Sequence, residues 1–192
     1  MLLAPGIIAT RGHEIVVAST DTLIQDEITM EPFRITKTID QIKEPEFDAL
    51  MFISGHLANV EVYWQDKLVL GLVDEFNTHD KPLAAICTTV PILRFAAKGK
   101  RVSFFPLLRS KQLLSAAGAV LQPVSLSVDY NLVTAEYQMV AEVWANEFCN
   151  LLEGKPRESF FEDSGFTPGR RERKPIPEVE RLKAQKLTNR GG

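Results

Sequence analysis

The sequence predicts an α/β domain built on a mostly parallel sheet, because short apolar runs alternate with segments of helical periodicity along most of the chain. Three segments carry this prediction. Residues 83–87, after Lys81-Pro82, form a continuous apolar run that suits a buried central strand, and residues 58–77 repeat apolar side chains with a helical period. Residues 124–134 place two short strands around a polar turn, which is typical of a hairpin.

The remaining elements follow in strand and helix order. Strands are expected at 13–19 and 47–54, so that the strand at 47–54, the helix at 58–77 and the strand at 81–87 make a right-handed βαβ unit. A helix at 91–97 is expected next because small residues lead into Pro91. The later elements are a strand at 101–104, a helix at 107–117, a strand at 119–121, the hairpin strands at 124–128 and 132–134, and an amphipathic helix at 137–152 ended by Gly154.

Size and composition limit the protein to one main domain. At 192 residues with 45% hydrophobic content, the chain can fill one core but not two comfortable ones. We expect a domain over residues 1–154 and an arm over residues 155–192. A net charge of −3 argues against a nucleic-acid-binding surface, and no apolar run approaches the roughly 20 residues that span a membrane.

The cysteine spacing and the glycine motifs further limit the cofactors, the disulfides and the cellular location that we expect. Cys87 and Cys149 have neither the spacing of metal ligands nor that of a disulfide framework, and the N-terminus lacks the order of a signal peptide. We therefore expect a reducing, cytoplasmic location. The chain has no GxGxxG motif and no Walker loop, so we expect no nucleotide cofactor, and we expect no metal either.

The C-terminal arm differs in composition from the rest of the chain. It carries ten basic and six acidic residues, and six proline and glycine residues between 156 and 177 break it into short pieces. Phe160, Phe161 and Phe166 are too apolar to stay solvated in a linker, so we expect the arm to bind a second copy of the chain or another protein partner. The alternative is a disordered basic tail.

Cys87 is the main candidate for chemistry. A strand-to-helix turn would place this thiol at the positive end of a helix, where backbone N–H groups and the helix dipole favour the thiolate. That position suits a nucleophile. The alternative is a core thiol, since free cysteine is among the most buried residue types. Cys149 lies on the apolar stripe of the helix at 137–152 and is expected in the core.

Six segments, taken in order, resemble one known family. They are Phe47-Asp48-Ala49-Leu50 leading to Gly55, Lys81-Pro82-Leu83-Ala84-Ala85-Ile86-Cys87, Gly99-Lys100-Arg101-Val102-Ser103, Ala117-Gly118-Ala119, Val128-Asp129 and Asn131-Leu132-Val133-Thr134. Over about residues 5–153 the chain resembles the ThiJ/PfpI (DJ-1) family of the class I glutamine-amidotransferase-like superfamily. The resemblance implies a flavodoxin-like three-layer sandwich, a nucleophile-elbow cysteine at Cys87, an oxyanion site around Gly55 and Thr88, and a homodimer or larger assembly.

The chain differs from this family at the positions where family members carry their catalytic and pocket residues. The family often has Cys-His-Gly-Pro at the elbow, but here Thr88 stands in place of the general-base histidine. Members without that histidine usually carry one in the segment that matches 104–106, and here Phe105 occupies it. A Gly-Gly pair has become Gly55-His56, and an Arg-Gly-Pro-Gly loop has become Glu136-Tyr137-Gln138-Met139. His56 and Glu136 are therefore the candidates for a replacement base, against the simpler interpretation that both are exposed surface residues.

The N-terminus departs as well. Family chains open with a strand and a turn whose acidic residue hydrogen-bonds the cysteine. Aligning Pro5 with the proline that follows this acid puts the acid at about Met1, so the sequence lacks both the acid and the first strand. A misassigned start codon, a rearranged first helix and sheet, or another segment or chain in the gap would each account for this.

Three functions fit these observations. The sequence favours a ThiJ/PfpI-like protein that has lost standard family catalysis and acts as a stress-linked, binding or assembly protein, because one cause then explains several altered positions. The first alternative is an enzyme of the cysteine-hydrolase, glyoxalase or deglycase type in which Cys87 attacks a carbonyl. The second is a thiol redox sensor, which needs a reactive Cys87 but no base.

Overall fold

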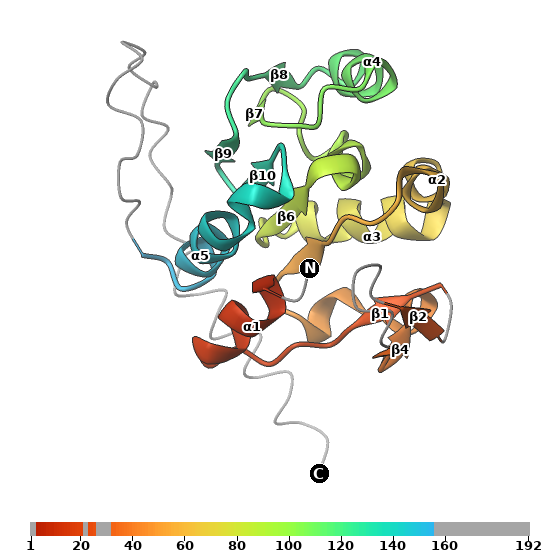
Figure 1. Cartoon of the computed structure of the whole chain (residues 1–192), viewed down its shortest axis with the longest axis vertical. Coiled ribbons are helices and arrows are strands. Elements are labelled where there is room, and N and C mark those ends of the chain that lie inside the picture. The colour runs from red at the N-terminus through yellow and green to blue at the C-terminus, as the bar shows by residue number, and fades with distance from the viewer. Residues whose placement is uncertain (1–2, 21–22, 26–31, 156–192) are drawn as a thin grey trace. The chain divides into compact units, whose positions relative to one another are not determined.

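The computed structural model describes residues 3–20, 23–25 and 32–155, with the backbone alone described at 3, 23–25, 32–34, 58 and 59. The described residues form an α/β domain around a four-stranded sheet with the strand order β5–β6–β10–β9 (Figure 1). Strands β5 (Leu50–Phe52), β6 (Leu83–Ile86) and β10 (Leu132–Ala135) run parallel, and β9 (Leu126–Asp129) is antiparallel to β10. The prediction of a mostly parallel sheet is confirmed.

Both faces of this sheet are covered, because alternate residues of the central strand enter different cores. Leu83 and Ala85 pack on one side in a core that includes the fully buried Trp64 and Phe76. Helices α3 (Lys67–Thr78) and α4 (Leu108–Ala116) contribute to this core. Ala84 and Ile86 face the other core, which contains α1 (Leu3–Thr10) and α5 (Ala141–Leu152). The sheet and its two helical layers make the three-layer sandwich that the family resemblance implies (Figure 1).

Two short parallel strands, β7 (Arg101–Val102) and β8 (Val120–Leu121), extend this arrangement beside the hairpin. Side chains rather than a continuous ladder attach them to the main sheet. The Arg101 N–H donates to the Asp129 carboxylate at 2.8 Å, and the Ser103 N–H donates to the Thr134 hydroxyl at 2.9 Å. This attachment places the segment after β7 at the same edge of the sheet as the ends of β6 and β10.

The hairpin agrees with the sequence-based expectation, whereas the helix predicted at 137–152 begins only at Ala141, after a 3₁₀ turn (Gln138–Val140). β9 and β10 flank the turn at Tyr130 and Asn131, where Tyr130 takes a φ of 55°. Helix α5 ends at Leu152, and Gly154 follows with a φ of 66°, a conformation that glycine adopts without steric cost.

Three expected elements differ most from the structure in extent or type. The single helix at 58–77 is instead α2 (Leu57–Val60), a 3₁₀ turn (Glu61–Trp64) and α3. Asp66 causes the restart, because its carboxylate accepts from the N–H groups of the residues two and three positions later at 2.9 and 3.0 Å. The strand at 13–19 is reduced to β1 (Ala18–Ser19), paired in parallel with β4 (Lys37–Thr38). The helix at 91–97 is a 3₁₀ helix over Cys87–Leu93, which starts directly at the end of β6.

The described part of the chain begins with helix α1 rather than with a strand, and β5 forms an edge of the four-stranded sheet within the described residues. A small antiparallel pair, β2 (Leu23–Gln25) and β3 (Pro32–Arg34), lies between β1 and β4 in sequence.

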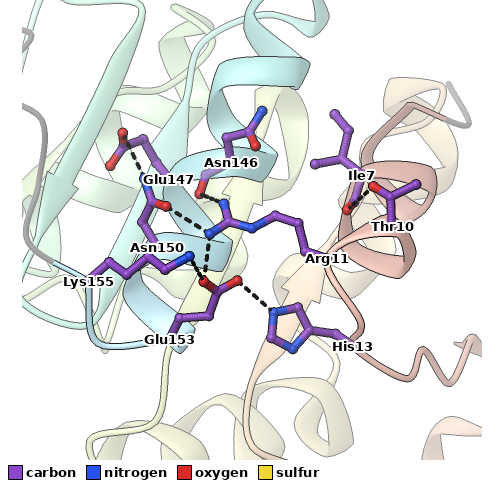
Figure 2. A network of polar contacts seen from close by, with 9 residues as sticks. All are labelled: Ile7, Thr10, Arg11, His13, Asn146, Glu147, Asn150, Glu153 and Lys155. Carbon is purple, nitrogen blue, oxygen red and sulfur yellow. Dashed lines mark hydrogen bonds and ion pairs between the residues drawn. The ribbon is translucent and has the colours of Figure 1, made fainter.

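Helix α1 is attached to α5 by both apolar and polar contacts. Ala4 and Ile8 pack in the same core as Trp144. Arg11, just after α1, donates to the Asn146 carbonyl at 3.1 Å and to the Asn150 side chain at 3.0 Å (Figure 2). The N-terminal helix is thereby fixed on the face of the sheet that α5 covers.

The arm predicted at 155–192 lies outside the described residues except for Lys155, so its docking stays a prediction. No helix in the described ranges is long and apolar enough to cross a membrane.

Candidate functional site

Cys87 lies at the sharp turn that the sequence predicted. It follows β6 directly, begins the 3₁₀ helix Cys87–Leu93 and takes a φ of 59°. A non-glycine residue in this left-handed region is strained and persists only where its surroundings hold it. The side chain is half-buried, so the thiol is not enclosed in the core as Cys149 is. The expected elbow geometry is confirmed.

The side-chain hydroxyl of Thr89 stabilises this turn. Its hydroxyl accepts from the Ile86 N–H at 3.1 Å and lies 2.7 Å from the Ile86 carbonyl oxygen and 3.1 Å from the Phe52 carbonyl oxygen. Only 3% of Thr89 is exposed, so these bonds form away from water. One hydroxyl thus ties the ends of β5 and β6 to the first turn of the helix.

Thr88 fixes the other side of the elbow. The Trp64 indole N–H donates to the Thr88 carbonyl oxygen at 2.9 Å, and the Thr88 hydroxyl lies 2.7 Å from the Ser54 hydroxyl. Thr88 is therefore occupied in structural bonds through its side chain and its carbonyl group.

The two expected oxyanion donors lie on either side of this Ser54–Thr88 contact. Gly55 follows Ser54, and the Thr88 N–H follows Cys87 along the chain. Among the described hydrogen bonds of turns, loops and caps, none is donated by the N–H of Gly55 or of Thr88. N–H groups near a nucleophile suit the stabilisation of an oxyanion. His56 is exposed and immediately precedes α2.

The pairing register of the sheet places Glu136 at the same sheet edge as Cys87. Ala135 is the last residue of β10 and pairs with Ile86, the last residue of β6. Glu136 and Cys87 come next on these neighbouring parallel strands, so both follow the same edge of the sheet. Carboxyl ends of parallel strands are where ligands bind in open α/β sheets.

Tyr137 lies beside Glu136 and was not considered as a site residue from the sequence. Its ring packs edge-on against Phe105, with centroids 5.4 Å apart and an interplanar angle of 87°. A hydrogen bond with the Glu136 side chain is the largest cause that raises the pKa of Tyr137, followed by desolvation and by the charges of Glu136 and the Cys87 thiolate. The pKa of Tyr137 therefore lies above the usual phenol range, which favours the protonated hydroxyl.

The sheet edge at the ends of β6 and β10 thus carries the half-buried thiol of Cys87 and the side chains of Glu136 and Tyr137. Two of the three histidines contact carboxylates elsewhere, His13 with Glu153 and His79 with Glu44. The parallel pairing of β6 with β10 is the signal that indicates Tyr137, because Tyr137 follows β10 and Cys87 follows β6. No group of three metal-ligating side chains occurs in the described part of the chain.

Comparison with known proteins finds a matching family model and similar sequences. A model of the DJ-1/PfpI family matches residues 3–151. The chain is 26% identical over 154 residues to the uncharacterised protein MJ0967 of Methanocaldococcus jannaschii, covering 77% of this chain and 72% of that protein. It is 28% identical over 143 residues to the deglycase PfpI of Pyrococcus furiosus, covering 73% of this chain and 84% of that protein.

Solved structures share the fold at lower identity. A ThiJ/PfpI domain protein from Brachyspira murdochii matches with a TM-score of 0.72 and 21% identity, covering 80% of this chain and 87% of that one. DJ-1beta of Drosophila melanogaster matches with a TM-score of 0.68 and 20% identity, covering 80% and 83%.

Proposed function

Because the chain belongs to the DJ-1/PfpI family, we propose that it uses Cys87 as a nucleophile towards small carbonyl compounds, as a glyoxalase or deglycase-type enzyme. The observation that carries this proposal is the elbow, where a half-exposed thiol with a φ of 59° is held by Thr88 and Thr89. A strained, well-anchored cysteine has a cost in stability, and such strain is concentrated at functional sites. The similarity to a deglycase from P. furiosus supports the same class of chemistry.

The chemistry is an addition to a carbonyl group. The Cys87 sulfur bonds to the carbonyl carbon while the π electron pair moves to the oxygen, and the N–H groups of Gly55 and Thr88 donate to that oxygen. Glu136 is the carboxylate on the adjacent strand end and the candidate base. His56 is a second candidate, because it lies two residues after Ser54, whose hydroxyl contacts Thr88.

Turnover of methylglyoxal tests this proposal. Full-length protein is expected to consume methylglyoxal, whereas Cys87→Ser is expected to be inactive. Cys149→Ala is the matched control, since Cys149 is buried on α5 and burial raises the pKa of its thiol. Equal rates for wild type and Cys87→Ser would refute a Cys87-dependent enzyme.

A second candidate is the function that the sequence favours, a binding or assembly protein without standard family catalysis. The observation in its favour is that Thr88 and Phe105 occupy the two positions where related chains carry a histidine, while His13 and His79 contact Glu153 and Glu44. In this case the C-terminal arm would join copies of the chain or bind a protein partner. Truncation after Lys155, which keeps the Lys155–Glu153 ion pair, should then reduce the oligomer size or the melting temperature. Unchanged values for both would mean that the arm has no such role in the isolated protein.

The half-exposed Cys87 also leaves the redox function open. A peroxide would convert the Cys87 thiolate to a sulfenic acid, with the peroxide O–O bond reduced and hydroxide released. Mild hydrogen peroxide should then produce a sulfenic acid that a dimedone probe traps at Cys87 and not at Cys149. Absence of the adduct would rule out a sensor function.

A further inference from the structure

Arg94 is a buried cation for which the described residues provide no counter-charge. It directly follows the 3₁₀ helix Cys87–Leu93 and is only 9% exposed. The other arginines whose side chains the structure describes all pair with a carboxylate, although they are more exposed; these are Arg11, Arg101 and Arg109. No ion pair within the described residues includes Arg94. A buried charge without a partner is costly, so an anion from outside the described domain would stabilise this guanidinium.

The hydrogen bonding of Arg94 leaves most of its donors unused. Its Nη1 donates to the Pro91 carbonyl oxygen at 3.2 Å, whereas a guanidinium group carries five N–H donors. Within the described part of the chain, this is the only hydrogen bond that the Arg94 side chain makes. Burial also lowers the pKa of Arg94, but a guanidinium keeps its charge at neutral pH. The remaining N–H groups are therefore charged donors that an external acceptor can use.

Phe95 places an exposed aromatic ring against this guanidinium. The Cζ atom of Arg94 lies 4.4 Å from the centroid of the Phe95 ring, and Phe95 is 57% exposed. The two neighbouring residues thus offer N–H donors and an apolar surface side by side. An inorganic ion would use only the donors, whereas an organic carboxylate would use both parts.

We propose that Arg94 and Phe95 form a binding site for a small organic carboxylate. The carboxylate oxygens accept from the unused N–H groups of Arg94, and the apolar part of the ligand lies on the Phe95 ring. The site is separate from the Cys87 elbow, because 7 residues of 3₁₀ helix, with a rise of about 2 Å each, put about 14 Å between the two backbone positions. It therefore does not depend on the reaction proposed for Cys87.

A titration of the isotope-labelled full chain with phenylacetate, followed by NMR, tests this proposal. Phenylacetate carries one carboxylate and one apolar ring, so it can use both parts of the site. The side-chain N–H signal of Arg94 and the backbone N–H signal of Phe95 should shift. Arg94→Met should weaken binding by about 10-fold or more, because it removes the donors and keeps an apolar stem. Acetate should bind wild type more weakly than phenylacetate, since it has no apolar ring.

Two further variants complete the experiment. Arg109→Met is the matched control, because the Arg109 Cζ atom also lies near an aromatic ring, 5.6 Å from the Trp64 centroid, but Arg109 pairs with Glu61. It should bind phenylacetate like wild type. Phe95→Ala, at an exposed position, should bind phenylacetate no more tightly than acetate. This variant tests the site even if Arg94→Met does not fold.

Each outcome supports or refutes the site. Saturable binding that Arg94→Met loses and Arg109→Met keeps supports it. If wild type does not bind phenylacetate, or if wild type and Arg94→Met bind it equally well, the site is refuted. If inorganic phosphate binds as tightly as phenylacetate, an organic carboxylate is refuted as the ligand. If Phe95→Ala still prefers phenylacetate to acetate as strongly as wild type does, the apolar part of the site is refuted.

Discussion

Arg11 and Glu153 form an ion pair that joins the segment after α1 to the end of α5, with Arg11 Nη2 2.7 Å from Glu153 Oε2 (Figure 2). The other Glu153 oxygen lies 3.1 Å from His13 Nε2, and Lys155 also pairs with Glu153. One carboxylate therefore receives donors from both ends of the described domain. The hydrogen bonds from Arg11, then Lys155 and His13, lower the pKa of Glu153 to about 2.

This ion pair predicts an acid-dependent contribution to stability. Because the folded-state pKa of Glu153 lies below its ordinary value of 4.5, the contribution is present above pH 4.5 and is lost as the pH falls towards 2. Glu153→Gln should melt at a lower temperature than wild type at pH 6, and the difference should shrink between pH 4.5 and 2. Glu142→Gln, at an exposed position of α5, is the control that should follow wild type. A wild-type-to-Glu153→Gln difference that is independent of pH would contradict the prediction.

A second ion pair joins the start of β6 to the 3₁₀ turn Glu44–Glu46. Lys81 Nζ lies 2.6 Å from Glu44 Oε1 and donates to the Phe47 carbonyl oxygen at 2.6 Å, and Glu44 is only 4% exposed. Lys81→Met should lower the free energy of unfolding by about 3 kcal/mol, because it leaves the buried Glu44 carboxylate with only the His79 imidazole, 3.3 Å away, as a basic neighbour. Urea denaturation measures this change.

Lys37→Met provides the control for that variant. Lys37 pairs with Glu46 at 2.8 Å, but the two side chains are 35% and 53% exposed, so its loss should cost less than about 1 kcal/mol. Equal losses for Lys81→Met and Lys37→Met would show that burial does not distinguish the two pairs.

The hydroxyl of Thr89 predicts a link between stability and reactivity. Thr89→Val keeps the shape of the side chain but leaves backbone groups of Ile86 and Phe52 without their buried partner. We expect a loss of about 2 kcal/mol in the free energy of unfolding and slower alkylation of Cys87, because the elbow loosens. Thr36→Val is the control, since the Thr36 hydroxyl bonds the Val17 backbone at an exposed position. If both variants lose equal stability, the elbow does not depend on Thr89.

The backbone conformation of Cys87 predicts that glycine is more favourable than alanine at this position. At a φ of 59°, a glycine avoids the steric cost that any Cβ imposes. Cys87→Gly should therefore be more stable than Cys87→Ala by about 1 kcal/mol, although glycine usually destabilises a folded chain. Thermal melting of the two variants measures the difference. A less stable Cys87→Gly would mean that the turn carries no strain.

The sequence by itself determined the fold class, the elbow and the hairpin, because each depends on local pattern. An apolar run such as 83–86 predicts a buried strand wherever it packs, and a two-residue turn between 126–129 and 132–135 specifies antiparallel pairing. The turn expected after this strand pointed to Cys87, and the family resemblance then implied its role as a nucleophile. The loss of family catalysis that the sequence favours stays a prediction, as do the functions assigned to His56 and Glu136.

Tertiary structure decided which side chains meet. The register of β6 against β10 brings Glu136 and Tyr137 to the end of the strand that carries Cys87, although 49 positions separate Cys87 from Glu136 in the sequence. Periodicity cannot reveal this, because it records which face a residue occupies and not which strand lies beside it. The interruption of the predicted helix at Asp66 was also visible only in the structure. The apolar period continues through 58–77, but a single capping carboxylate and the packing of Trp64 end one helix and start another.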